Sequence, residues 1–307
     1  MTHGIDVTCS SLGHVLIATS RRCVAIALIL LVSSCVTLTL EPRALLLQDD
    51  GSVRVQSLVC GGPSFVEPVA SEQTKEGRQL DPASIRLLTW NIHKEGDAGW
   101  QTDLRGFVGT NDLVLLQENV LGPELRSIVE DAGMRWVMAS SVMYGEKLID
   151  IGVLTAARTA PLASCTQRVV EPLIRIPKSA VISWFRLRGK AETLAVVNVH
   201  AINFSLLLGA YKAQLDALAD ALASHSGPII FAGDLNTWTD ARTEALRETA
   251  GKVGLTEIAY PGDKRKVFFG KQLDHVLVRG LETVASTPIA VTSSDHNPVQ
   301  VTLRVVP

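Results

Sequence analysis

The sequence predicts an α/β (α+β) sandwich in which mixed β-sheets and helices form layers. Short apolar runs are separated by polar turns, and many of the runs come in neighbouring pairs with no helix between them. A strict βαβ repeat would place a helix between every two strands. Neither GxGxxG nor GxxxxGK[ST] occurs in the chain, so a dinucleotide-binding or P-loop architecture has no support.

Length and composition allow one large domain or two ordinary ones, because the chain has 307 residues. Hydrophobic residues make up 47% of it and aromatic residues only 5%, so Leu, Val, Ile and Ala must build most of the core. The formal net charge is −2, and residues 82–307 contain 23 Lys and Arg against 23 Asp and Glu. Overall charge therefore gives no reason to bind a polyanion, and any attraction for phosphate must be local or metal-mediated.

Residues 1–40 differ from the rest of the chain. Arg21 and Arg22 precede an uncharged apolar run over 23–32, and small residues follow up to Cys35. A basic flank, an apolar run and small residues describe a signal peptide for export, and the residues around Cys35 resemble a lipobox that would make this cysteine the lipidated N-terminus. An uncleaved membrane anchor is the alternative. We expect the cell envelope as the location, with a cytoplasmic protein whose start is assigned too far upstream as the other interpretation.

Residues 41–81 are expected to be a linker, and residues 82–307 the folded domain. Turn-forming strings such as 49–51 and 61–63 interrupt any long periodicity in the first of these segments. The five cysteines have no CxxC spacing, so a zinc site is not supported. Cys60 and Cys165 could form a disulfide if the domain is exported; the alternative is that Cys165 is a small apolar core residue.

Periodicity predicts the elements of the domain in order. The clearest helix is expected over 205–224, where Leu208, Tyr211 and Leu215 recur on one face before Gly227 and Pro228 end it. Further helices are expected over 100–108, 123–132 and 240–250. Strands are expected over 85–90, 112–116, 136–138, 151–154, 180–187, 194–199, 228–232, 273–278 and 299–305.

Polar residues follow several of these apolar runs where each strand ends. Asn91, Glu118, His200 and Asp234 come at or just after the strands near 85–90, 112–116, 194–199 and 228–232. Such strand ends can meet at one cleft and hold a divalent cation with a phosphate.

Glu118 and Asn91 are candidate ligands of a hard cation. A carboxylate at a buried sheet edge costs free energy unless it is compensated, either by a metal ion or by an Arg or Lys partner. Mg²⁺ takes oxygen ligands, usually from one or two carboxylates together with water and substrate phosphate, and Mn²⁺ is the expected substitute. Asn91 can add a neutral oxygen, although such a residue also commonly caps a turn.

Candidate catalytic groups lie in the second half of the chain. Asp234 and Asn236, two residues apart, can address one phosphate from the same edge, although the string could also be a turn. Asp295 is a possible metal carboxylate beside His296, an imidazole suited to accept a proton, and Asp274 could orient that ring. The alternative for such a pair is a surface turn.

His200 could donate a hydrogen bond to a phosphoryl oxygen or protonate a leaving group. A single histidine at the end of an apolar strand is otherwise most simply a core residue with satisfied hydrogen bonds.

In their order along the chain, these motifs resemble the endonuclease/exonuclease/phosphatase superfamily, which includes DNase I, abasic-site endonucleases, neutral sphingomyelinases and inositol polyphosphate 5-phosphatases. The resemblance runs from about residue 85 to 305, and strings at 177–180, 198–205 and 225–228 look like its bacterial YafD-like branch. It implies a four-layer α/β sandwich of the DNase I-like type, with two mixed sheets flanked by helices.

The resemblance also implies roles for individual residues. Asn91, Glu118 and Asp295 would surround a metal ion. Asp234 and Asn236 would polarise the attacking water and bind phosphate, His296 held by Asp274 would be a general base or a phosphate ligand, His200 would contact the phosphoryl group, and Asn203 a neighbouring phosphate oxygen. The implied reaction is metal-assisted in-line attack of water on a phosphodiester.

Two departures from the family pattern bear on these roles. His93 stands where some DNA-repair members have an acidic residue. His200 matches the DNase I and sphingomyelinase type, whereas abasic-site enzymes use Tyr.

Residues 263–271 are a candidate substrate loop. They combine basic residues, including Lys264, Arg265 and Lys266, with Phe268 and Phe269. Bases can stack on the aromatic rings while the cations hold phosphates, the same loop could meet anionic lipid headgroups, or it could be a solvated loop. Lys178 would add positive potential nearby.

We therefore expect a monomeric, nuclease-like phosphodiesterase. A phospholipid-headgroup phosphodiesterase or inositol-phosphate phosphatase is the alternative, and a catalytically silent binding protein is the third. Nucleic acid is favoured over lipid as the substrate, with membrane attachment through the N-terminal segment or a lipidated Cys35.

Overall fold

The computed structural model describes residues 38–39, 45–49, 52–62, 65, 67–68, 78–144, 149–205 and 208–306. They belong to one compact unit, Thr37–Pro307. The predicted signal or anchor lies outside the described residues apart from Leu38–Thr39, which form the short strand β1. No helix in the described part of the chain is long and apolar enough to cross a membrane.

The larger sheet has strand order β16-β17-β4-β5-β7-β6-β2-β3, with β1 paired to β6. Its pairs are antiparallel except β4 with β5, which run parallel. The strands of this sheet are β1, β2 (Leu45–Asp49), β3 (Ser52–Gln56), β4 (Ile85–Asn91), β5 (Leu113–Val120), β6 (Arg135–Tyr144), β7 (Ile149–Ala157), β16 (Leu281–Pro288) and β17 (Val299–Val305).

The smaller sheet has strand order β12-β15-β11-β10-β9-β8, and its parallel pair is β10 with β11. A separate hairpin, β13 (Val267–Phe268) with β14 (Lys271–Gln272), carries the predicted substrate loop. The strands of the smaller sheet are β8 (Ala163–Val170), β9 (Pro177–Arg186), β10 (Thr193–His200), β11 (Ile229–Asp234), β12 (Thr256–Glu257) and β15 (Asp274–Arg279).

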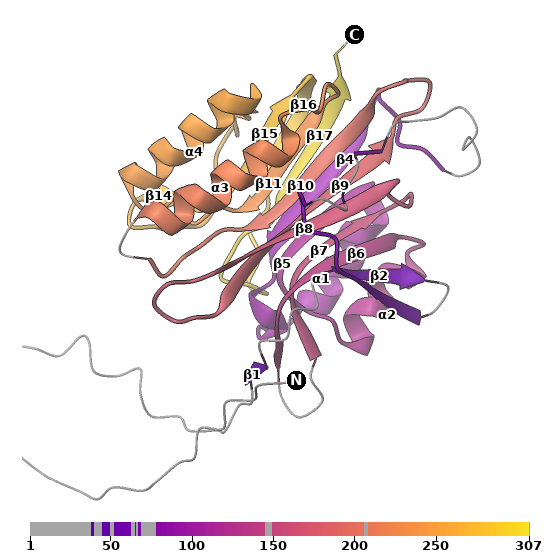
Figure 1. Ribbon diagram of the computed structural model, residues 1–307. Coiled ribbons are helices and arrows are strands. Elements are labelled where there is room, and N and C mark those ends of the chain that lie inside the picture. Colours follow the sequence, from indigo (N-terminus) through magenta and orange to yellow (C-terminus); the bar gives the residue numbers. More distant parts are fainter. Residues whose placement is uncertain are drawn as a thin grey trace, which may run out of the picture. The chain divides into compact units, whose positions relative to one another are not determined.

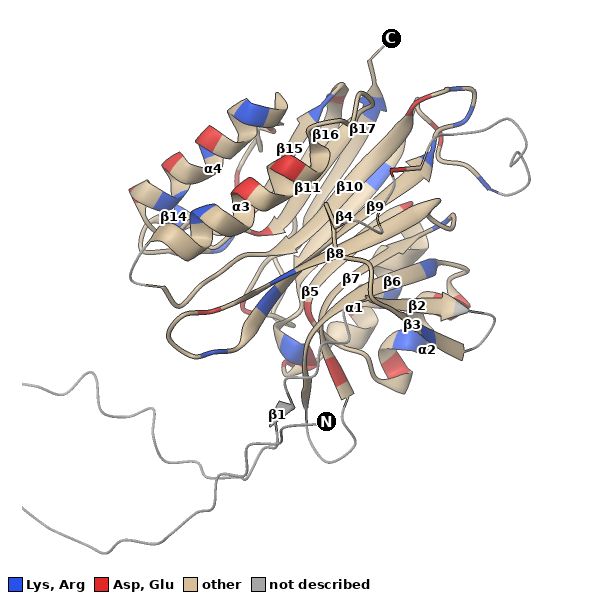
Figure 2. Ribbon diagram, in the orientation of Figure 1, with Lys and Arg blue, Asp and Glu red and all other residues tan. Residues whose placement is uncertain are grey.

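Helices cover the outer face of each sheet (Figure 1). The helices α1 (Trp100–Thr110) and α2 (Pro123–Asp131) pack on the larger sheet, while α3 (Leu208–Leu222) and α4 (Asp240–Val253) pack on the smaller one. Figure 2 shows basic and acidic residues interspersed along α3 and α4, as expected of solvated helix faces.

Side chains that point alternately to the two faces of each strand produce the layers. In β5, Leu113 and Leu115 pack between the two sheets, whereas Val114 and Leu116 face α1 and α2. Successive side chains of a strand point to opposite faces, so a continuous apolar run must be covered on both sides. The order helices, sheet, sheet, helices confirms the predicted four-layer sandwich with two mixed sheets.

The structure corrects the predicted elements mainly at the sheet edges. The segment expected to be a linker, 41–81, contributes β2 and β3 to the larger sheet, where Leu46 pairs with Met138. The strands β8 and β16 were not predicted, because both carry several polar residues and border solvent at a sheet edge. All four predicted helices are present, with ends shifted by a few residues.

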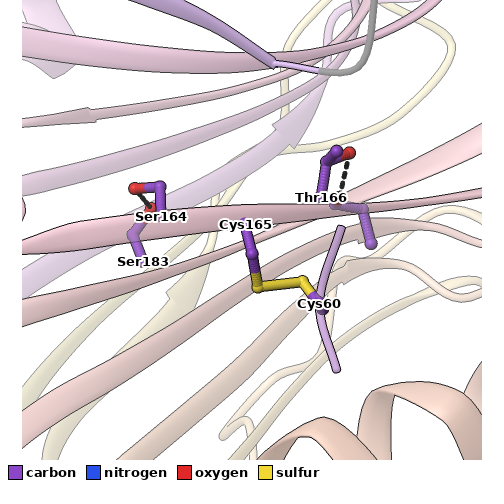
Figure 3. Close-up of a disulfide and its surroundings, with 6 residues drawn as sticks. Cys60, Ser164, Cys165, Thr166 and Ser183 are labelled. Carbon is purple, nitrogen blue, oxygen red and sulfur yellow. Dashed lines mark hydrogen bonds between the residues drawn. A yellow bond between two sulfur atoms is a disulfide. The ribbon is translucent and has the colours of Figure 1, made fainter. Parts of the chain in front are cut away.

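A disulfide joins Cys60 to Cys165 on β8 (Figure 3). Backbone hydrogen bonds support it on both sides: Cys60 N donates to Thr166 O at 3.0 Å, and Thr166 N donates to Leu58 O at 2.8 Å. The bond therefore fixes part of the expected linker to the edge of the smaller sheet, and Cys165 is both a fully buried residue and a disulfide partner.

Candidate active site

The site forms where the carboxyl ends of the two parallel strand pairs face each other. Asn91 ends β4, His200 ends β10 and Asp234 ends β11, with His200 and Asp234 paired in register. The two sheets are joined just beneath these residues, because Gln117 Nε2 donates to Asn198 Oδ1 at 2.7 Å. This buried amide contact fixes the separation of the two halves of the site.

A β-bulge turns Glu118 out of the β5 ladder. The register with β7 shifts between Gln117 and Asn119, and Glu118 has a φ of 52°. A non-glycine residue in this left-handed region is strained, and such strain at a sheet edge commonly re-aims a functional side chain.

Three nitrogen-bearing side chains surround the Glu118 carboxylate. Lys94 Nζ donates to Oε2, while His200 Nε2 and Lys178 Nζ lie 3.6 and 4.0 Å from Oε1. Burial alone would raise the pKa of Glu118, but the cations around its carboxylate, Lys178 and Lys94 among them, outweigh it and lower the pKa to about 2. Glu118 is therefore ionised at neutral pH and directed toward cations.

Lys94 comes from a turn with unusual backbone geometry, the 3-10 segment η2 (His93–Glu95). His93, Lys94 and Glu95 have φ values of 50°, 53° and 60°. Three consecutive non-glycine residues in this region are strained, and the contacts of Glu95 with Val120 N and of Lys94 with Glu118 hold the turn in place.

Asp234 links the two sheets at the centre of the site. It is 2% exposed, and its Oδ2 accepts a hydrogen bond from Asn91 Nδ2 at 3.0 Å. The same oxygen lies 3.5 Å from His200 Nε2 and 3.9 Å from His296 Nε2. Three of the predicted residues thus converge on one carboxylate oxygen.

His296 is held by Asp274, as predicted from the sequence. Its Nδ1 donates to Asp274 Oδ2 at 2.8 Å, which directs Nε2 toward Asp234. Burial alone would lower the pKa of His296, but the carboxylates of Asp274 and Asp234 outweigh it and raise the pKa to about 10. The imidazole is therefore protonated at neutral pH.

In contrast to His296, the imidazole of His200 is neutral at neutral pH. Burial is the main cause, and the charge of Lys178 adds to it, lowering the pKa of His200 to about 4. Lys178 Nζ donates to the unprotonated Nε2 of His200 at 2.8 Å. The hydrogen-bond donor at this position is thus Lys178, whose own pKa is lowered by burial, and His200 orients it.

Asn236 and Asn203 lie on the same side of the site. Asn236 N donates to Asp234 Oδ1 within the buried turn after β11, and its Nδ2 donates to Ala201 O, which follows β10. Asn203 Oδ1 accepts from Trp238 Nε1 at 3.0 Å.

Two buried charged residues that the sequence did not reveal hold the loop carrying Asn203. Glu171 Oε1 accepts from Asn203 N and Phe204 N, while Arg242 donates to Ile202 O and Asn203 O. No local motif marks either residue, because each acts on a loop at least thirty residues away. Lys94 was also missed, although its position directly after His93 could have suggested a role.

The predicted substrate cations behave differently from one another. Lys264 and Lys266 are exposed. The Arg265 side chain is only 8% exposed, and it donates to Asp263, Glu257 and the carbonyl oxygen of Asp274. The prediction that Arg265 binds substrate is corrected to a positioning role beneath Asp274, because its donors are used inside the protein.

The residues present fit Mg²⁺ or Mn²⁺, which keep water and substrate ligands, better than they fit a metal ion coordinated by protein side chains alone. Among the described residues, no group of three or more His, Cys, Asp and Glu side chains is arranged to hold a metal ion. Glu118 and Asn91 offer a carboxylate and an amide oxygen at the site, whereas the Asp295 side chain is 59% exposed and lies 3.9 Å from His93 Nδ1. One or two carboxylates completed by water and substrate phosphate are the usual ligands of Mg²⁺.

The fold and this site define a class of protein. The model of the Endonuclease/Exonuclease/phosphatase family matches residues 88–296. The chain therefore belongs to this family, whose members are hydrolases acting on phosphoester bonds.

Curated relatives place the chain in the UPF0294 branch, which corresponds to the predicted YafD-like group. A UPF0294 protein of Vibrio parahaemolyticus is 36% identical over 253 residues, covering 79% of this chain and 89% of the relative. One of Klebsiella pneumoniae is 40% identical over 221 residues, covering 71% of this chain and 81% of the relative. An endonuclease/exonuclease/phosphatase structure from Beutenbergia cavernae shares the fold, with a TM-score of 0.59 and 19% identity. The match covers 73% of this chain and 72% of that structure.

Proposed function

We propose that this protein is a metal-dependent phosphodiesterase that hydrolyses its substrate by in-line attack of water. The observation that carries the proposal is the convergence of Asn91, His200 and His296 on Asp234, with the ionised Glu118 beside His200. Buried acids, amides and imidazoles with divergent pKa values are typical of active sites and unusual in a purely structural core.

Glu118, with Asn91 and Asp295, is the proposed binding site for Mg²⁺ or Mn²⁺. When bound, the ion would supply positive charge to the developing charge on the phosphoryl oxygens. Lys178 supplies a further hydrogen-bond donor from the side of His200.

The hydrogen bonds support a proposal for the proton roles. Asp234 is the proposed acceptor of the water proton as the new bond from oxygen to phosphorus forms. His296, charged and held by Asp274, is the proposed contact to the phosphoryl group and the donor to the leaving oxygen as its bond to phosphorus breaks.

Nuclease-like hydrolysis is one candidate for the natural reaction. It is favoured by the family motifs and by the exposed Lys264 and Lys266 near the aromatic pair Phe268 and Phe269. Hydrolysis of a lipid headgroup is the other candidate, favoured by the exposed aliphatic residues Leu173 and Ile174 in the β8–β9 turn, which precedes Lys178.

Hydrolysis of bis-p-nitrophenyl phosphate with Mg²⁺ or Mn²⁺ tests the proposal without assuming either substrate. We expect metal-dependent turnover that falls by about 10³-fold or more in Asp234→Ala, in the range of losses for an essential proton acceptor. DNA, RNA, phospholipid and inositol phosphate then identify the class. Absence of turnover on every phosphoester with either ion would instead favour a silent binding protein.

We also propose a location in the cell envelope. The Cys60–Cys165 disulfide supports this, because such bonds persist in oxidising compartments and are rare in the cytosol of mesophiles.

A further inference from the structure

Exposed apolar side chains lie on three loops that carry residues of the site or lead to them. We define the apolar rim as Leu173 and Ile174 in the β8–β9 turn, Phe204 after β10, and Phe268 and Phe269 in the β13–β14 hairpin. These side chains are between 43% and 76% exposed. Single exposed hydrophobic residues are ordinary, whereas several on adjoining loops mark an interaction surface.

Hydrogen bonds and ring contacts link the three loops that carry the rim. Glu171 accepts hydrogen bonds from Asn203 N and Phe204 N, which joins the β8–β9 turn to the loop after β10. Trp238 donates to Asn203 Oδ1 and lies 6.4 Å, centroid to centroid, from the ring of Phe269. Phe269 in turn contacts Phe268 at 4.4 Å.

Each of these loops also leads directly into the site. Lys178 follows the β8–β9 turn, His200 precedes Phe204, and Asp274 follows β14. A surface that binds the rim would therefore lie over the loops that enter the site.

The chemistry of the rim favours a lipid surface over nucleic acid. Leu173 and Ile174 have no ring on which a base can stack, whereas aliphatic tips partition readily into the boundary between headgroups and acyl chains. Nucleic-acid affinity depends on many phosphate contacts, yet Arg265 is engaged inside the protein, which removes one cation of this loop from phosphate binding. Arg175, Lys264 and Lys266 are exposed on two of these loops, where basic side chains attract anionic headgroups.

We propose that the apolar rim docks onto an anionic lipid surface and that the phosphodiester presented to the site is a lipid headgroup. The choice of substrate rests on the proposed phosphodiesterase activity, whereas the docking does not. Phe269 would enter the interface with Leu173 and Ile174 beside it, while the basic side chains contact the headgroups.

A tryptophan probe in the full chain tests the docking where it should occur. Phe269→Trp is compared with Val284→Trp on β16, which replaces another well-exposed apolar residue of the larger sheet. Vesicles of phosphatidylcholine and phosphatidylglycerol with brominated acyl chains should quench added emission from position 269 and leave that from position 284 unchanged. Because the readout is local, any binding through residues 1–40 does not mimic it.

A second variant measures the contribution of the aliphatic tips. Leu173→Ser with Ile174→Ser, in the Phe269→Trp background, should weaken the vesicle-dependent quenching by about tenfold, since two apolar side chains are lost from the interface. Both positions are exposed, so the fold should be retained, and circular dichroism checks this.

The outcomes separate docking from activity. Equal quenching at positions 269 and 284, or a response of the 269 probe to single-stranded DNA but not to vesicles, would overturn the docking. Docking without hydrolysis of any phosphodiester would leave the surface intact and remove the proposed function. Hydrolysis of the soluble diester and of DNA, with no headgroup released from the same vesicles, would overturn the lipid substrate.

Discussion

Asp234 Oδ2 is approached by an amide nitrogen and by two imidazoles whose environments differ. His200 is buried beside Lys178 and stays neutral, whereas His296 lies between two carboxylates and is charged. Each environment is built from residues distant in the sequence, so identical side chains acquire different roles.

Leaving-group chemistry can separate the roles of Asp234 and His296. Asp234→Asn should lower turnover by about 10²–10⁴-fold on aryl and alkyl phosphodiesters alike, because the water proton has no acceptor. His296→Gln should cost at least about tenfold more on an alkyl than on a p-nitrophenyl diester, since nitrophenolate leaves without a proton. Steady-state rates on the two substrates measure the difference, and equal losses in His296→Gln would argue against the donor role.

Lys94 should compete with a metal ion for Glu118. Removing its charge in Lys94→Gln should tighten Mn²⁺ binding several-fold, because the ammonium already compensates the carboxylate. Titration calorimetry with Mn²⁺ provides the measurement, and Lys190→Gln in the β9–β10 turn is the matched control. Unchanged or weaker binding in Lys94→Gln would mean that Lys94 assists the ion.

Glu95 should make stability depend on pH. Burial is the main cause that raises its pKa from 4.5 to about 7, although the hydrogen bond from Val120 N opposes it. Between these values the unfolded chain releases a proton that the folded chain retains, so stability should fall as pH rises from 4.5 to 7. In Glu95→Gln, the decrease in unfolding free energy between these two pH values should be smaller by on the order of 2 kcal/mol. Urea unfolding at a series of pH values measures it.

At the scale of elements, close approach of β10 and β11 decides whether His200 and Asp234 meet. Gly233 has a φ of 142°, and a Cβ added there would lie 2.0 Å from Val199 O. A side chain would force the two strands apart at the site end.

Gly233→Ala should therefore destabilise the protein by roughly 2–4 kcal/mol and disturb the site. In Gly106→Ala on α1 a Cβ meets no atom within 4 Å, and the substitution should stabilise by about 0.5–1 kcal/mol through helix propensity. Urea unfolding compares the two variants. A small loss of unfolding free energy in Gly233→Ala would show that the strands can separate without cost.

Across the whole molecule, the disulfide closes a long loop between the segment before the domain and β8, with a sequence separation of 105. Replacing both cysteines by alanine, Cys60→Ala together with Cys165→Ala, should lower the free energy of unfolding by roughly 4–5 kcal/mol in the chain-entropy description. Chemical denaturation of the parent with and without a thiol reductant should reproduce the difference. If reduction leaves the midpoint unchanged, the bond does not contribute to stability.

The sequence by itself determined the layers and most of the strand ends that carry the site. Uninterrupted apolar runs such as those in β5 and β11 require cover on both faces, and polar residues at their ends must then lie at a sheet edge. Edge strands such as β16, which border solvent and carry mixed side chains, leave no comparable pattern.

Only the tertiary structure decided which charges compensate one another. That Lys94 and Lys178 approach Glu118, that Arg265 is withdrawn beneath Asp274, and that two histidines differ in protonation all depend on distances between segments far apart in the chain. Local sequence records the type of each group, whereas burial and neighbouring charge set its protonation and its partner.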